Sequence, residues 1–159
     1  MNALSKLLTG AAIGLAVSIT SFAAVAETPA NMLVIAHRID DVTTIDPAES
    51  FEFAGSDISR NVYSRLVNLD PMDLSAGYKP DLAESWEVSE DGKTITFTLR
   101  EGVTFHSGNP VTAEDAAVSL QRAVILNKTP AFILTQFGFT PENVAETIKA
   151  DGNKLMITT

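Results

Sequence analysis

The sequence has 159 residues, with 11 Lys and Arg against 20 Asp and Glu, so its formal charge at pH 7 is −9. Hydrophobic residues make up 45% and charged residues 19%, a balance typical of about one folded domain and not of a disordered chain. The acidic excess argues against nucleic-acid binding, and the absence of cysteine excludes disulfides, cysteine-ligated metals and cysteine nucleophiles.

Residues 1–26 have the pattern of a secretory signal peptide. Lys6 is their only charged side chain, an apolar stretch occupies residues 7–17, and residues 24–26 (AVA) place small side chains at the cleavage positions. A transmembrane anchor is the alternative, but the apolar stretch is short for a membrane span. We therefore expect export to the periplasm and cleavage after Ala26. Since no cysteine is available to carry a lipid, the protein is not expected to be a lipoprotein.

The first part of the mature chain predicts a strand, a loop and a helix. Residues 32–36 (MLVIA) form a continuous apolar run, typical of a strand buried on both faces. Residues 48–56 indicate a loop. Apolar residues at four-residue steps then predict a helix over residues 58–66, capped by Ser56 or Asp57. The stretch that follows, up to Pro80, is rich in turn residues.

Two Asp-Gly pairs predict two β-hairpins. Residues 94–99 (TITFTL) alternate between polar and apolar after the first pair, so Ile95, Phe97 and Leu99 are expected to face the core. Residues 148–158 repeat the same pattern around the second pair.

A helix is predicted between the two hairpins, over residues 113–126. Thr112 is a natural N-cap, and acidic residues in the first turn suit the positive end of the helix dipole. Its buried face is expected to consist of Ala113, Ala116, Ala117, Leu120 and Val124.

No catalytic or metal-binding constellation is evident. His37 and His106 lie far apart and lack neighbours at metal-ligand spacing, and the adjacent acids at 40–41 and 90–91 suit solvated turns better than paired-carboxylate hydrolysis. Trp86, at the start of an alternating strand, is interpreted as a core residue and not as a ligand platform. We expect no enzyme activity, no metal and no cofactor.

One long block of sequence resembles a known family. Residues 80–94 (PDLAESWEVSEDGKT), 97–108 (FTLREGVTFHSG) and 110–115 (PVTAED) closely resemble the N-terminal block of the family 5 extracellular solute-binding proteins, the periplasmic peptide-, dipeptide- and nickel-binding receptors of ABC importers. Residues 44–47 (TIDP) and 58–63 (ISRNVY) are also similar to that family.

The resemblance implies an α/β fold: the N-terminal part of a bilobed periplasmic-binding-protein fold of type II, with an inserted extra α+β subdomain. Residues 27–66 would begin ligand-binding lobe I, and residues 67–159 would form the extra subdomain with two hairpins and a helix. The chain stops at Thr159 inside a predicted strand, so we expect a fragment. Ser107 departs from the aspartate that the family more often carries.

The resemblance also implies a ligand-contacting loop after the first strand. It maps onto five residues, with Phe53 the foremost contact: Phe51, Glu52, Phe53, Ala54 and Gly55. Aromatic rings would give adaptable apolar contact, and exposed backbone around Gly55 could hydrogen-bond a peptide. The alternative is that both rings plug the junction between strand and helix.

Three functions remain open at this point. The first is a monomeric periplasmic receptor that captures peptides or similar small solutes and delivers them to an inner-membrane ABC permease. The second is a nickel or metallophore receptor of the same family. The third is a secreted hydrolase whose catalytic residues the sequence does not reveal.

Overall fold

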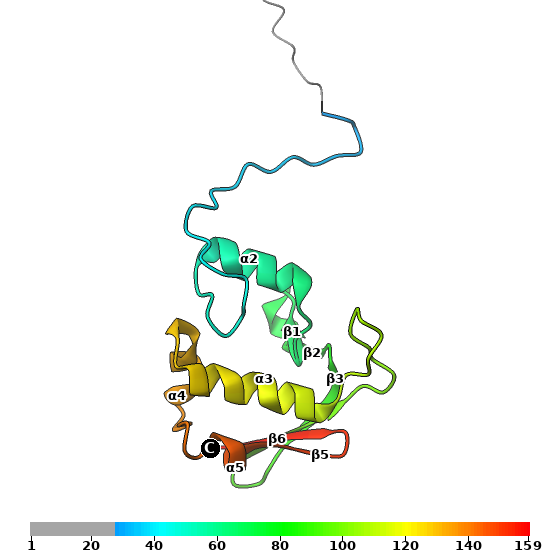
Figure 1. Ribbon diagram of the computed structural model, residues 1–159. Helices are drawn as coiled ribbons and strands as arrows, with labels where there is room; N and C mark the ends of the chain where they lie inside the picture. The colour runs from blue at the N-terminus through cyan, green and yellow to red at the C-terminus, as the bar shows by residue number, and fades with distance from the viewer. Residues whose placement is uncertain (1–27) are drawn as a thin grey trace, which may run out of the picture. The chain divides into compact units, whose positions relative to one another are not determined.

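The structure, a computed structural model, describes residues 28–159, so the predicted signal peptide lies outside the described residues (Figure 1). The chain divides into two units, Met1–Ala36 and His37–Thr159. In the first unit, the described residues form one turn, in which the Met32 N–H donates to the Pro29 carbonyl at 2.9 Å. The predicted strand over residues 32–36 is wrong. A buried strand needs a neighbour to satisfy its backbone groups, and none of the described strands pairs with this run.

The second unit is built on an antiparallel sheet of four strands in the order β3-β4-β6-β5. The strands are β3 (Ala83–Val88), β4 (Thr94–Leu99), β5 (Ile148–Asp151) and β6 (Lys154–Thr158). Both predicted hairpins are confirmed, and their turns place Gly92 and Gly152 at φ of 71° and 60°, where only glycine is unstrained. The two hairpins join through β4 and β6, where the buried residues Phe97 and Leu155 are paired.

Helix α3 (Ala113–Leu126) packs against β5 and β6 (Figure 1). The predicted cap is confirmed: the Thr112 hydroxyl accepts from the Asp115 N–H, and the Asp115 carboxylate accepts from the Thr112 N–H in return. The predicted core face is also confirmed. Its fully buried members are Ala113, Ala117 and Val124, while Ala116, Leu120, Ile95 and Trp86 are partly buried against the same core.

Helix α2 (Phe53–Val62) begins five residues before the predicted start of 58 and ends at 62, not 66. Ser56 and Asp57 therefore lie within the helix and cannot cap it, and the second half of the predicted 48–56 loop is helical. The cause is local: Glu52 is extended, with ψ of 154°, and Tyr63 is extended again, with ψ of 140°.

The predicted turn region contains a small antiparallel sheet of two strands. It comprises β1 (Val67–Leu69), the 3-10 helix η1 (Leu74–Ala76) and β2 (Tyr78–Pro80). Between α3 and β5 lie η2 (Thr129–Ala131), α4 (Phe132–Thr135) and α5 (Val144–Thr147). Within residues 28–159, the helices are too short or too polar to cross a membrane.

Candidate functional site

The segment that leads into α2 is organised by the carboxylate of Glu52. One oxygen, Oε1, accepts from the Thr43 hydroxyl at 2.9 Å. The other, Oε2, accepts from the Ser50 hydroxyl and from the Phe51 N–H, each at 3.1 Å. A hydrogen bond from its own backbone N–H, followed by the bond from Thr43, lowers the pKa of Glu52 below its ordinary value. Glu52 therefore serves the loop itself, as an anion at the start of a helix.

Gly55 is placed by close packing against the same loop. A Cβ at this position would lie 2.1 Å from Ser50 Oγ, closer than any real contact allows. Gly55 and Ala54 are both buried in the first turn of α2, so the predicted exposure of the backbone around Gly55 is wrong. The glycine is needed because helix and loop approach closely, with Ser50 only 8% exposed.

The two aromatic rings of the segment have different environments. Phe53, the first residue of α2, is 90% exposed. Phe51 is 47% exposed, and its ring meets that of Phe132 of α4 edge to face, with centroids 5.3 Å apart and planes at 80°. Phe53 is thus the predicted contact residue most available to a ligand. Phe51 is held by its contact with Phe132 and remains about half exposed.

An ion pair that no sequence pattern predicts joins this segment to α3. Arg122 donates from Nη1 to Asp46 Oδ1 at 2.9 Å and from Nη2 to Oδ2 at 2.6 Å. The hydrogen bonds from Arg122, followed by the one from the Ala48 N–H, lower the pKa of Asp46. The same pairing raises the pKa of Arg122. The two residues are 76 positions apart, and only the fold brings them together.

A groove of about 380 Å³ runs beside α2, a volume at the lower end of the usual range for ligand sites. It is lined by His37, Ile39, Ala54, Asp57, Ile58, Asn61 and Val62. Its floor is largely apolar, and at one point His37 Nε2 lies 3.4 Å from Asp57 Oδ2. Of the five predicted contact residues, Ala54 alone lines this groove.

The two histidines are not brought together with other metal ligands. His37 lies beside Asp57, while His106 is exposed in the turn between β4 and α3. Across residues 28–159, no three His, Cys, Asp or Glu side chains group closely enough to hold a metal ion. The chemistry offered by the described segment is therefore apolar and aromatic contact on a rigid polar support.

The chain is similar to known proteins in sequence and in fold. A family model described as bacterial extracellular solute-binding proteins, family 5 Middle, matches residues 77–159, which is more than half of the chain. The probable D,D-dipeptide-binding periplasmic protein DdpA of Escherichia coli (strain K12) is 37% identical over 108 residues, covering 67% of this chain and 21% of the relative. The glutathione-binding protein GsiB of Salmonella typhi is 38% identical over 113 residues, covering 71% and 21%.

A solved structure matches as well. The periplasmic oligopeptide-binding protein OppAIV of Borrelia burgdorferi aligns with a TM-score of 0.61 and 29% identity, over 72% of this chain and 25% of that one. The chain therefore has the fold of part of the bilobed periplasmic binding proteins. It spans about a fifth of the length of the curated relatives that it matches.

Proposed function

This chain belongs to the bacterial extracellular solute-binding proteins of family 5, and from that premise we propose that it captures peptides in the periplasm for delivery to an ABC permease in the inner membrane. The family consists of solute-binding receptors, so the cargo is held and released without chemical change. We also propose that residues 1–26 direct export and are cleaved after Ala26, and that the protein is a monomer.

The observation that carries the proposal is the family match over residues 77–159. Peptides are the favoured cargo because two of the similar proteins are named for dipeptide and oligopeptide binding. A receptor for varied peptides needs apolar contact that tolerates different side chains, which an exposed aromatic ring supplies.

Within the described residues, we propose that Phe53 makes the main ligand contact, with Phe51 beside it. Phe53 is 90% exposed yet stands on the first turn of a helix, so its backbone is fixed while its ring is free. Glu52, Ala54 and Gly55 support that position: Glu52 binds the loop, and the other two are buried.

The test uses the complete natural protein and a pool of synthetic tripeptides to pentapeptides. Native mass spectrometry should find intact peptides retained by the protein. Cleaved peptides would indicate a hydrolase instead, and retention of Ni²⁺ with no peptide would indicate a metal receptor. Either result would contradict the proposal.

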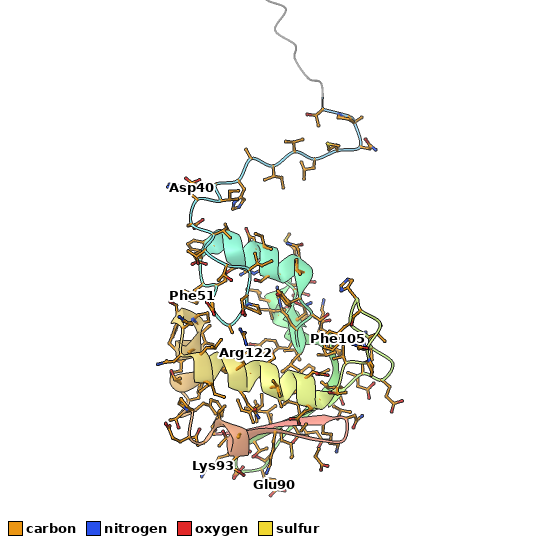
Figure 2. The ribbon with its side chains drawn as sticks, in the orientation of Figure 1. Asp40, Phe51, Glu90, Lys93, Phe105 and Arg122 are labelled. Carbon is orange, nitrogen blue, oxygen red and sulfur yellow. The ribbon has the colours of Figure 1, made fainter. Side chains whose placement is uncertain are left out.

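Phe53→Ala tests the proposed contact. Burial of a phenylalanine ring by a ligand contributes about 2 kcal/mol, so peptide affinity should fall by at least about tenfold. The matched control is Phe105→Ala, which removes a partly exposed ring from the turn between β4 and α3 (Figure 2). If Phe53→Ala and Phe105→Ala bind peptide with equal affinity, Phe53 is not a ligand contact.

A further inference from the structure

The Asp46–Arg122 pair has the geometry of a specific anchor. Two parallel hydrogen bonds, at 2.9 and 2.6 Å, join the planar guanidinium to both oxygens of one carboxylate. This arrangement fixes the relative orientation of the two groups as well as their distance. The side chain of Arg122 is 46% exposed and that of Asp46 is 29% exposed, so the pair is only partly screened by solvent.

Asp46 in turn fixes the backbone that follows it. Its carbonyl accepts from the N–H groups of Glu49 and Ser50, at 3.0 and 2.8 Å, and its Oδ1 also accepts from the Ala48 N–H at 3.0 Å. Residues 46–50 therefore form a turn that is closed around Asp46. A contact that fixes the position of Asp46 therefore also fixes the turn of residues 46–50.

The turn is connected directly to the first turn of α2. Ser50, at its end, donates to Glu52 Oε2 at 3.1 Å, and its Oγ occupies the place that a Cβ on residue 55 would take. Phe53 lies between Ser50 and Gly55 in the sequence. The position of the Phe53 backbone is thus set by a continuous series of contacts that begins at Arg122 on α3.

We infer that Arg122 is a positioning residue for ligand binding: through Asp46 it holds the turn 46–50 and, with it, the exposed ring of Phe53. This inference rests on the proposed function and extends it to a residue that does not touch the ligand. A ring held in its binding position loses less conformational freedom when a ligand binds, so the anchor raises affinity by preorganisation. The edge contact of Phe51 with Phe132 steadies the same segment from α4.

The experiment compares four variants of the complete protein with the wild type: Arg122→Ala, Arg122→Lys, Asp46→Asn and the double variant Asp46→Asn with Arg122→Ala. Hydrogen exchange without ligand reports on amides 48–51, which the turn and Glu52 hold. Affinity is measured by calorimetry with the same pool of tripeptides to pentapeptides. Arg100→Ala is the control, because this exposed arginine belongs to none of the ion pairs among residues 28–159.

Arg122→Ala should speed exchange at amides 48–51 and leave the β4–β6 ladder unchanged. Peptide affinity should fall by about two- to tenfold, the size expected when one side chain that was held in place has to be ordered on binding. The double variant should bind no worse than either single variant, because all three break the same pair. Arg122→Lys, which keeps the charge but not the paired geometry, should lie between wild type and Arg122→Ala.

Unchanged exchange at amides 48–51 in Arg122→Ala would overturn the inference, as would faster exchange spread equally over α3 and the sheet. If the wild type binds no peptide from the pool, the proposed function fails, and the exchange measurement decides the inference by itself. Faster exchange confined to the segment then supports the anchor, and unchanged exchange rejects it.

Discussion

Residues 83–158 and residues 43–62 are stabilised by different kinds of contact. The sheet and α3 enclose a core of fully buried apolar side chains, among them Val124, Ile148 and Leu155. The segment around α2 has few buried side chains and is held by carboxylates: Glu52 within the loop and Asp46 across to Arg122. Apolar burial is non-directional and contributes most of the folding free energy, whereas hydrogen-bonded carboxylates contribute less but fix orientation.

This difference between an apolar core and a polar, hydrogen-bonded segment suits the proposed binding function. A segment that must keep an aromatic ring exposed cannot be stabilised by burying that ring. Under the proposed function, its geometry has to come from polar contacts that leave the ring free. Four predictions test whether the two regions differ as described.

The largest effect is expected from a cavity in the core. Ile148→Ala removes a side chain that is 0% exposed, so the free energy of unfolding should fall by about 2–5 kcal/mol. Urea unfolding followed by the fluorescence of Trp86, the single tryptophan, measures it. Ile125→Ala, at 56% exposure, is the control and should change stability far less. Similar losses for both would contradict a core centred on the sheet.

The second effect concerns the close approach in the polar segment. Gly55→Ala places a Cβ against Ser50 Oγ, and such overpacking should cost about 1–3 kcal/mol. Ser50→Ala removes the obstructing oxygen, so the double variant should be no less stable than Ser50→Ala alone. Additive losses in urea unfolding would show that the contact between loop and helix is not the constraint.

The third effect concerns a polar contact within the apolar region. Thr112→Ala removes the N-cap of α3 and should cost about 1 kcal/mol, less than the core cavity. Thr112→Ser keeps the hydroxyl and should retain most of the stability in urea unfolding. If Thr112→Ser loses as much stability as Thr112→Ala, the methyl group of Thr112, and not its capping hydroxyl, stabilises the fold.

The smallest effect is expected from acid. Asp46 and Glu52 have pKa values lowered from 3.8 and 4.5, so their contribution is complete above these values and is lost as the pH falls through the folded pKa. Below about pH 4, protection of amides 48–51 should therefore decline before that of the β4–β6 ladder. Exchange corrected for intrinsic rates measures both. A simultaneous decline would mean that the two regions unfold as one.

The sequence predicted the apolar region better than the polar one, for a physical reason. Alternation around Asp-Gly and the N-cap residue Thr112 are local signals, and they located β4, β6 and α3 correctly. The run at 32–36 also has a local strand signal, but a strand needs a partner that no local pattern supplies.

For the candidate site, the sequence indicated the segment but not its geometry. The sequence predicts a loop over residues 48–56, whereas Phe53, Ala54 and Gly55 begin α2. The start was missed because Glu52 supports the loop through its side chain without being a typical N-cap residue. Arg122 contacts Asp46, which is 76 positions away in the sequence, and Phe132 contacts Phe51 over a similar separation. No rule based on residue spacing reaches that far.

The separation of Asp46 from Arg122 also sets an order of assembly. A chain is made from its amino terminus, so the Phe53 segment emerges well before α3 exists. Each hairpin can close around its own turn as soon as it is complete. The surface proposed to meet the ligand takes its final shape later, when the helix that carries Arg122 has docked on the sheet.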